Sequence, residues 1–147
     1  MADIAFNISK GRVVHYASLP ATNDALVLVP IETTGIESDA TLMDYDTLDA
    51  ILAGASAEQT TMGRKTVTDV TVTVDDANDR VDVDIPDQTW VAASGNAISA
   101  LVVCYDPDTT AGDDTTLIPL TKHDFVATPS GGDITAQIAT AGFYRAT

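Results

Sequence analysis

The sequence has little cysteine, few basic residues and no long apolar run. Cys104 is the only cysteine, so an intrachain disulfide is impossible, and its position in an apolar stretch predicts a buried, inert thiol. No stretch reaches the roughly eighteen apolar residues of a membrane-spanning helix. The first residues lack the basic and apolar regions of a signal peptide. We therefore expect a soluble chain that is made in a cytoplasm.

The scarcity of basic residues gives the chain a strongly acidic balance. Lysine and arginine total 7, aspartate and glutamate total 22, and the net charge at pH 7 is −15. Such a chain repels nucleic acid and anionic membranes, so we expect neither as a partner. A solvated acidic surface that maintains solubility is the first expectation. Docking on a basic partner and weak cation binding are the other uses of such a surface.

The usual signatures of catalysis and cofactor binding are missing. His15 and His123 are the only histidines, and neither belongs to a zinc-binding spacing. His123 and Asp124 are adjacent, and neighbours on a strand point to opposite faces, which is poor geometry for a catalytic base and its orienting acid. No serine lies in a Gly-x-Ser-x-Gly turn, and no glycine-rich phosphate loop is present. We therefore predict neither an enzyme nor a cofactor.

Most of the chain has the patterns of short β-strands. Residues 66–74 alternate valine with threonine or aspartate, and residues 81–85 alternate apolar residues with aspartate. Residues 25–31 and 101–105 are continuous apolar runs, which are typical of strands buried on both faces. We interpret residues 81–85 and 101–105 as a pair of core strands with Trp90 as a packing anchor.

One amphipathic helix is predicted over residues 41–53. Ser38 and Asp39 are helix-capping residue types, and Gly54 follows the last periodic residue. The predicted apolar stripe consists of Leu42, Tyr45, Leu48, Ile51 and Leu52. With roughly eight short strands in 147 residues, we predict a mostly β (α+β) fold. The expected architecture is an antiparallel β-sandwich or barrel of short strands with this single helix.

The N-terminal residues 1–18 differ in charge from the rest of the chain. They carry two of the seven basic residues and few acids, and their apolar residues alternate as in a strand. They form either the first strand pair of the domain or an arm that adds to a neighbour's sheet. In the second case, residues 19–147 form a single β-rich domain. The predicted partner-binding residues are then Ile4, Phe6, Ile8, Lys10, Arg12, Val14 and Tyr16.

Two acidic loops are candidates for weak cation binding. The first contains Asp75, Asp76 and Asp79, and the second is the long polar loop 106–114. Neither loop has the spacing of an EF-hand. A weak calcium site is therefore an alternative to ordinary solvated turns, with Asp75, Asp76 and Asp79 as its ligands.

Several segments are similar to a group of small tailed-phage proteins. The resemblance involves residues 7–14, residues 78–90 and residues 102–110, and it continues in residues 123–125 and 141–143. It spans most of the chain, and no functional residue is carried over from it. The group is encoded with virion structural genes, so the resemblance implies a virion structural protein.

A capsid decoration (cement) protein is the role that the resemblance favours. Its expected partners are the major capsid protein and further copies of itself, because a local threefold lattice site makes a homotrimer natural. The expected location is then the capsid surface of the virion. A neck or tail component and a calcium-dependent adhesion or carbohydrate-binding module are the alternatives.

Overall fold

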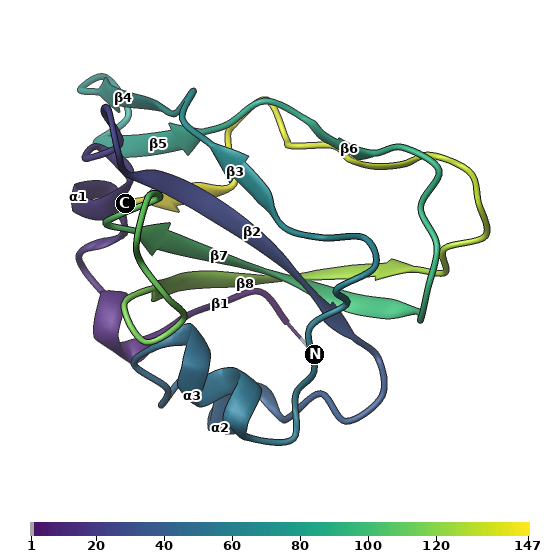
Figure 1. Ribbon diagram of the computed structural model, residues 1–147. Coiled ribbons are helices and arrows are strands. Elements are labelled where there is room, and N and C mark those ends of the chain that lie inside the picture. Colours follow the sequence, from purple (N-terminus) through teal and green to yellow (C-terminus); the bar gives the residue numbers. More distant parts are fainter. Residues whose placement is uncertain (1) are drawn as a thin grey trace.

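A five-stranded antiparallel sheet forms the centre of the fold (Figure 1). The computed structural model describes residues 2–147, so Met1, the first residue of the predicted arm, lies outside the described part. Two smaller sheets lie on one side of the central sheet, and the short helices within residues 39–53 lie on the other side. The fold is mostly β and sandwich-like with antiparallel sheets, which confirms the predicted fold class.

The described residues form ten strands and four short helical segments, more than the sequence predicts. The central sheet consists, in spatial order, of β1 (Ile4–Ala5), β8 (Ile118–Ala127), β7 (Ile98–Asp106), β2 (Ala25–Glu32) and β3 (Lys65–Val67). The smaller sheets consist of β10 (Tyr144–Ala146), β5 (Arg80–Asp84) and β4 (Thr71–Asp75), and of β6 (Gln88–Trp90) and β9 (Ile134–Ala136). The helical segments are η1 (Asn7–Ser9), α1 (Val13–Ala17), α2 (Asp39–Leu42) and α3 (Leu48–Ala53).

The central strands β2 and β7 send alternate side chains into two cores. Along β2, Leu26 and Leu28 belong to the core on the side of the smaller sheets. Val27 and Val29 belong to the core beneath α2 and α3. Burying each such side chain contributes about 1.5–3 kcal/mol. Residues 25–31 and 101–105 are thus strands buried on both faces, as predicted.

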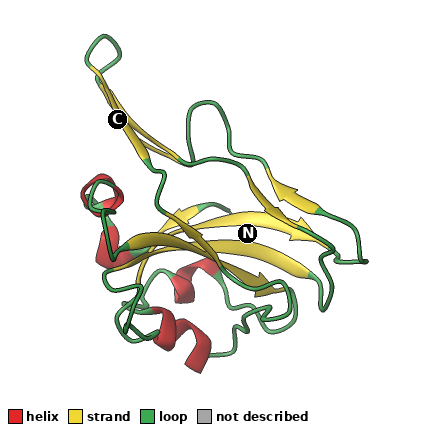
Figure 2. Cartoon of the chain, turned by 45° about the horizontal axis from the view of Figure 1, so that its top comes forward, coloured by secondary structure: helices red, strands yellow, loops and turns green. Residues whose placement is uncertain are grey.

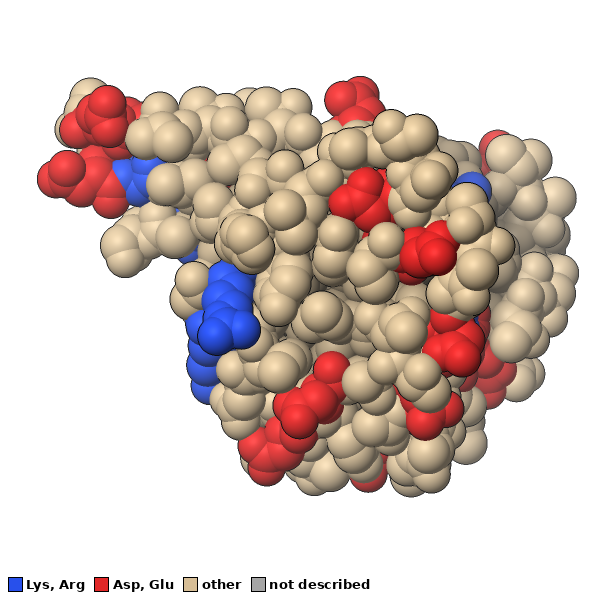
Figure 3. Space-filling view, turned by 60° about the vertical axis from the view of Figure 1, so that its left-hand side comes forward, with Lys and Arg blue, Asp and Glu red and all other residues tan. Residues whose placement is uncertain are grey.

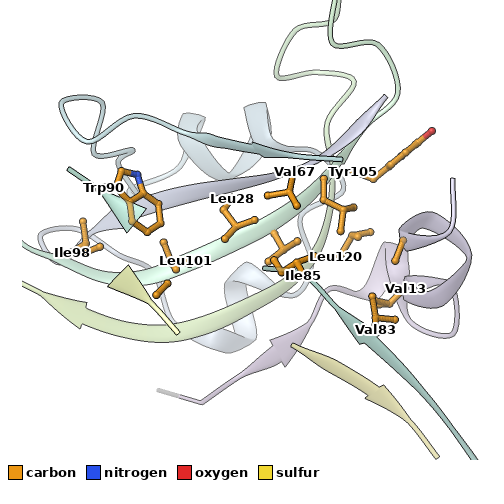
Figure 4. Close-up of a cluster of buried hydrophobic side chains, with 14 of the residues drawn as sticks. Val13, Leu28, Val67, Val83, Ile85, Trp90, Ile98, Leu101, Tyr105 and Leu120 are labelled. Carbon is orange, nitrogen blue, oxygen red and sulfur yellow. The ribbon is translucent and has the colours of Figure 1, made fainter. Parts of the chain in front are cut away.

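Trp90 is a packing anchor, but the strands around it are not paired as predicted. Its side chain is buried between the layers, and its Nε1 donates a hydrogen bond to the carbonyl oxygen of Gly63 at 2.8 Å (Figure 4). The predicted pair of residues 81–85 and 101–105 is wrong, because β5 pairs with β4 and β10 while β7 pairs with β2 and β8. Strand patterns identify strands, but they do not say which strands are neighbours.

The single strand predicted over residues 66–74 is divided between two sheets. Lys65–Val67 pairs with β2 in the central sheet, and Thr71–Asp75 pairs with β5 in the projecting sheet. Between them the N–H of Val70 bonds the carbonyl oxygen of Thr68, which turns the chain out of the first sheet. The alternation is in fact broken at this point, because Thr68 and Asp69 are consecutive polar residues between Val67 and Val70.

The predicted helix 41–53 is also divided. The Thr47 hydroxyl accepts a hydrogen bond from the N–H of Ala50, so Thr47 begins a new helix as its N-cap. The first helix already ends before Met43, whose carbonyl oxygen accepts a hydrogen bond from the N–H of Asn7. The predicted apolar stripe still faces the core beneath the central sheet. None of the helical segments in residues 2–147 has the length and apolar character that crossing a membrane requires.

The N-terminal segment is built into the domain rather than extended as a strand-forming arm. After β1, which pairs with β8, the chain turns through η1 and then forms α1. Phe6 is fully buried in the core beneath the central sheet. The Ser9 hydroxyl donates to the carbonyl oxygen of Leu120 at 2.8 Å. The alternation of apolar residues suggested a longer strand, but tertiary contacts with α2 and β8 determine the conformation here.

A charged network ties this segment to α2 and β8. The Lys122 side chain is fully buried, and its Nζ donates to Asp39 Oδ1 at 2.8 Å and to Asp124 Oδ1 at 2.7 Å. The backbone N–H of Ala2 donates to Asp39 Oδ2 at 2.8 Å, and that of Asp124 donates to Asp3 Oδ1 at 2.8 Å. A buried ammonium group is costly unless it has such partners.

Acid should weaken the fold partly through Asp39. The hydrogen bond from Lys122 lowers the pKa of the Asp39 carboxyl group below its ordinary value of 3.8, although desolvation acts in the opposite direction. A carboxyl group with a lowered pKa in the folded chain stabilises the fold above its unfolded pKa, and this stabilisation disappears as the pH falls through the folded pKa. We expect urea titrations to show a free energy of unfolding that declines below about pH 4. The decline should be shallower in an Asp39→Asn variant, and equal slopes would contradict this role.

Candidate functional site

The sheet of β4, β5 and β10 projects beyond the body of the molecule (Figure 2). Its far end is the turn between β4 and β5, where the predicted acidic turn is indeed found. Asp79 in this turn has a φ of 52°, a left-handed conformation that aspartate tolerates better than most residues. The projection is therefore a short, paired sheet with a tight turn at its tip.

The projecting sheet has one apolar face and one polar face. Cross-strand partners share a face, and successive residues alternate between faces. Val74, Val81 and Ala146 form one row, and Val72, Val83 and Tyr144 form the next row on the same face. The row between them, on the opposite face, consists of Thr73, Asp82 and Arg145. There Arg145 Nε donates to Asp82 Oδ1 at 2.5 Å.

The inner part of the apolar face is covered, and its outer part is covered incompletely, since Val81 and Ala146 are half-buried. Val83 is fully buried and contributes to the same core as Val13 of α1, and Figure 4 shows the two side chains close together. Towards the tip, Val74 is 66% exposed. An open groove of about 440 Å³ runs past Val74, Val81 and Ala146. We call these three residues the outer apolar face.

The tip carries three aspartates, which we call the acidic tip: Asp75, Asp76 and Asp79. A hydrogen bond from Asn78 and, to a smaller extent, the charge of Arg80 at 3.1 Å lower the pKa of Asp75. Asp76 and Asp79 are exposed and form no ion pair with any described residue. Within residues 2–147 no three His, Cys, Asp or Glu side chains are gathered as metal ligands, the predicted calcium ligands included.

Most of the basic residues are engaged within the chain. Ion pairs hold Arg64, Arg80, Lys122 and Arg145, and Lys65 Nζ lies 5.5 Å from the ring centre of Trp90. Lys10 and Arg12 are the remaining two, and both are exposed without an acidic partner among residues 2–147. Lys10 Nζ donates instead to Asn7 Oδ1 at 2.7 Å. We call Lys10 and Arg12 the basic corner.

The basic corner lies on the same side of the molecule as the projecting sheet. Arg12 immediately precedes α1, and α1 packs against β5. Figure 3 shows this side, with acidic side chains at the projecting end and a group of basic side chains below them. The outer apolar face, the acidic tip and the basic corner together form a surface that we call the binding face.

The structure places the predicted partner-binding residues in three different environments. Phe6 is fully buried, and Ile4 and Ile8 are half-buried against the same core. Val14 and Tyr16 are half-buried against the core on the other side of the central sheet. Lys10 and Arg12 are the exposed members of the set. Of the predicted partner-binding residues, only the two of the basic corner are therefore fully available for contact.

The outer apolar face was not predicted from the sequence. The alternation of Val70, Val72 and Val74 with polar residues predicts that these valines share one buried face. Val72 follows that expectation, whereas Val74 does not, because the hairpin extends past the elements that cover its inner half. No feature of the alternation distinguishes these two valines.

A cavity of about 250 Å³ between the central sheet and residues 137–143 is a second hollow in the described chain. Apolar side chains line most of it, and His123 lies at its edge, where Nδ1 is 3.1 Å from Asp3 Oδ2. His123 contacts Thr121 and Asp124 contacts Lys122, so the adjacent pair points to opposite faces of β8, as predicted. This arrangement does not align His123 with Asp124 for proton transfer.

Cys104 lies in the core beneath the central sheet. Burial raises the pKa of its thiol, so the thiolate form that reacts as a nucleophile is disfavoured.

Comparison of the chain with protein-family models, with curated proteins and with solved structures gave no match.

Proposed function

We propose that the chain is a structural protein of a tailed-bacteriophage virion that decorates the outer surface of the major capsid protein lattice. The observation that carries this proposal is the outer apolar face. An apolar sheet face bordered by charged residues is a typical site of protein–protein contact, and on a lattice it allows neighbouring copies to contact one another. The resemblance of residues 78–90 and 102–110 to virion proteins supports a virion as the assembly in which this contact is made.

The charge distribution is compatible with this role. Decoration requires many copies at high local concentration, and a net charge of −15 favours solubility under those conditions. A contact that is repeated across a lattice also needs only a modest affinity at each site when neighbouring copies contact one another. The proposed protein therefore works by binding and not by chemistry.

Binding to phage heads tests the proposal. Heads that lack the protein, mixed with an excess of the purified chain, should retain it through sedimentation. The retained amount should saturate at a fixed ratio to the major capsid protein, because lattice sites are identical and limited in number. An unrelated acidic protein of similar net charge is the control for non-specific retention.

Two results would contradict the decoration role. Retention by isolated tails or necks, with none by heads, would assign the chain to those parts of the particle. Retention by no part of the particle would remove the virion role altogether.

A further inference from the structure

We propose that the binding face is an interface between two copies of this chain related by a twofold axis. The outer apolar face shares a groove with the acidic tip, and its inner continuation packs against α1, which the basic corner directly precedes. A twofold rotation about an axis through this face places the acidic tip of each copy at the basic corner of the other. The two outer apolar faces then cover each other. A surface with an apolar middle and opposite charges at its two ends is complementary to itself, as an isologous contact requires.

The groups that would pair are available for pairing. Lys10 and Arg12 form no ion pair with a described residue of their own chain, and neither do Asp76 and Asp79. Pairing them across the axis therefore breaks no existing ion pair. Val74 is 66% exposed in the single chain, and the second copy would remove it from water. No other partner is needed to explain why both charge signs border the same apolar face.

The net charge of −15 opposes any contact between copies. At physiological ionic strength, however, charges more than about 8 Å apart are largely screened, whereas groups in direct contact are screened much less. The contact thus depends on which charges face each other and not on the total charge. Replacing acids of the acidic tip by basic or neutral residues lowers the net negative charge, which favours association. The same change places like charges in contact across the interface, which opposes association.

The proposed interface rests on the proposed function, because decoration of a lattice favours contact between copies. Its test uses the free protein without phage heads. Failure of head binding and failure of self-association are therefore separate results. The expected twofold pair also differs from the homotrimer that a threefold lattice site favours, so the measured mass distinguishes them.

Three variants are needed. The tip variant is Asp76→Lys with Asp79→Asn, since asparagine tolerates the left-handed φ at that position. The corner variant is Lys10→Glu with Arg12→Glu. The control variant is Asp46→Lys with Asp49→Asn, which makes the same change in net charge at two exposed positions near α3. Circular dichroism and thermal melting should show that all three fold like the unaltered chain.

Sedimentation equilibrium over a micromolar to millimolar concentration series measures the association. The unaltered chain of 15.4 kDa should reach twice that mass at high concentration. The tip and corner variants should each dimerise at least about tenfold more weakly, since like charges then face each other. The control variant should dimerise as well as the unaltered chain or better, because it lowers the net repulsion. An equimolar mixture of the tip and corner variants should regain the dimer, because each supplies the charges that the other needs.

Four outcomes would overturn the inference. One is a chain that stays monomeric throughout the series, and another is a tip variant that behaves like the control variant. A third is a mixture of the two variants that does not associate. The fourth is a trimer, because a threefold ring is built from head-to-tail contacts and contains no twofold axis between copies.

Discussion

Replacing Asp39 by alanine should lower the free energy of unfolding by about 3 kcal/mol. The side chain accepts a hydrogen bond from Lys122 Nζ at 2.8 Å, and Lys122 is fully buried. Without Asp39 the ammonium group retains only Asp124 among its acidic partners in the described chain. The cost arises from the buried charge that remains, not from the lost contact alone. Urea denaturation at neutral pH measures it.

A second substitution tests this explanation. Methionine at position 122 keeps most of the volume of lysine and removes the charge, so Asp39→Ala with Lys122→Met should be more stable than Asp39→Ala alone. Strictly additive losses would show that the two residues act independently. Asp46→Ala, at an exposed acidic residue, is the matched control and should change stability by less than about 0.5 kcal/mol.

Phe6→Ala should be at least as damaging, with a loss of about 3–5 kcal/mol. Phe6 is fully buried in the core with Leu42 and Leu48, and the surrounding strands and helices cannot close the space that its ring leaves. For the same reason, we expect removal of residues 2–16 to unfold the chain rather than to release a separate domain. Thermal melting and urea denaturation measure both changes.

Lys10→Ala is the matched control in the same segment, because Lys10 is exposed and forms no ion pair with a described residue. It should leave the stability within about 0.5 kcal/mol of the unaltered chain. The opposite pattern, with Phe6→Ala stable but defective in binding a partner, would restore the interpretation of this segment as a free arm.

The sequence alone supports the main layers of the fold. The apolar runs at residues 25–31 and 101–105 predict doubly buried strands, and β2 and β7 are those strands. Trp90 and the stripe from Leu42 to Leu52 face cores as expected. These predictions succeed because burial on one or two faces leaves a periodic trace in the residues themselves.

Strand pairing and side-chain exposure leave weaker traces. The consecutive polar residues Thr68 and Asp69 break the alternation where β3 and β4 separate, but they do not indicate which sheet each strand joins. The apolar alternation around Phe6 predicts a continuing strand, but the chain turns into η1 directly after Phe6. Val74 has the same local pattern as Val72 and is exposed because its sheet extends past its neighbours. These differences depend on distant parts of the chain, which a local pattern does not contain.

The hydrogen bond between Ser9 and Leu120 has a consequence for biosynthesis. The two residues are 111 positions apart, so the N-terminal segment emerges from the ribosome long before its partner strand exists. At ordinary rates of roughly 5–20 residues per second, Phe6 stays exposed for several seconds on each nascent chain. Because contacts between such distant segments form slowly, closure of this core should be among the last steps of folding. The nascent apolar segment therefore needs protection from aggregation during synthesis.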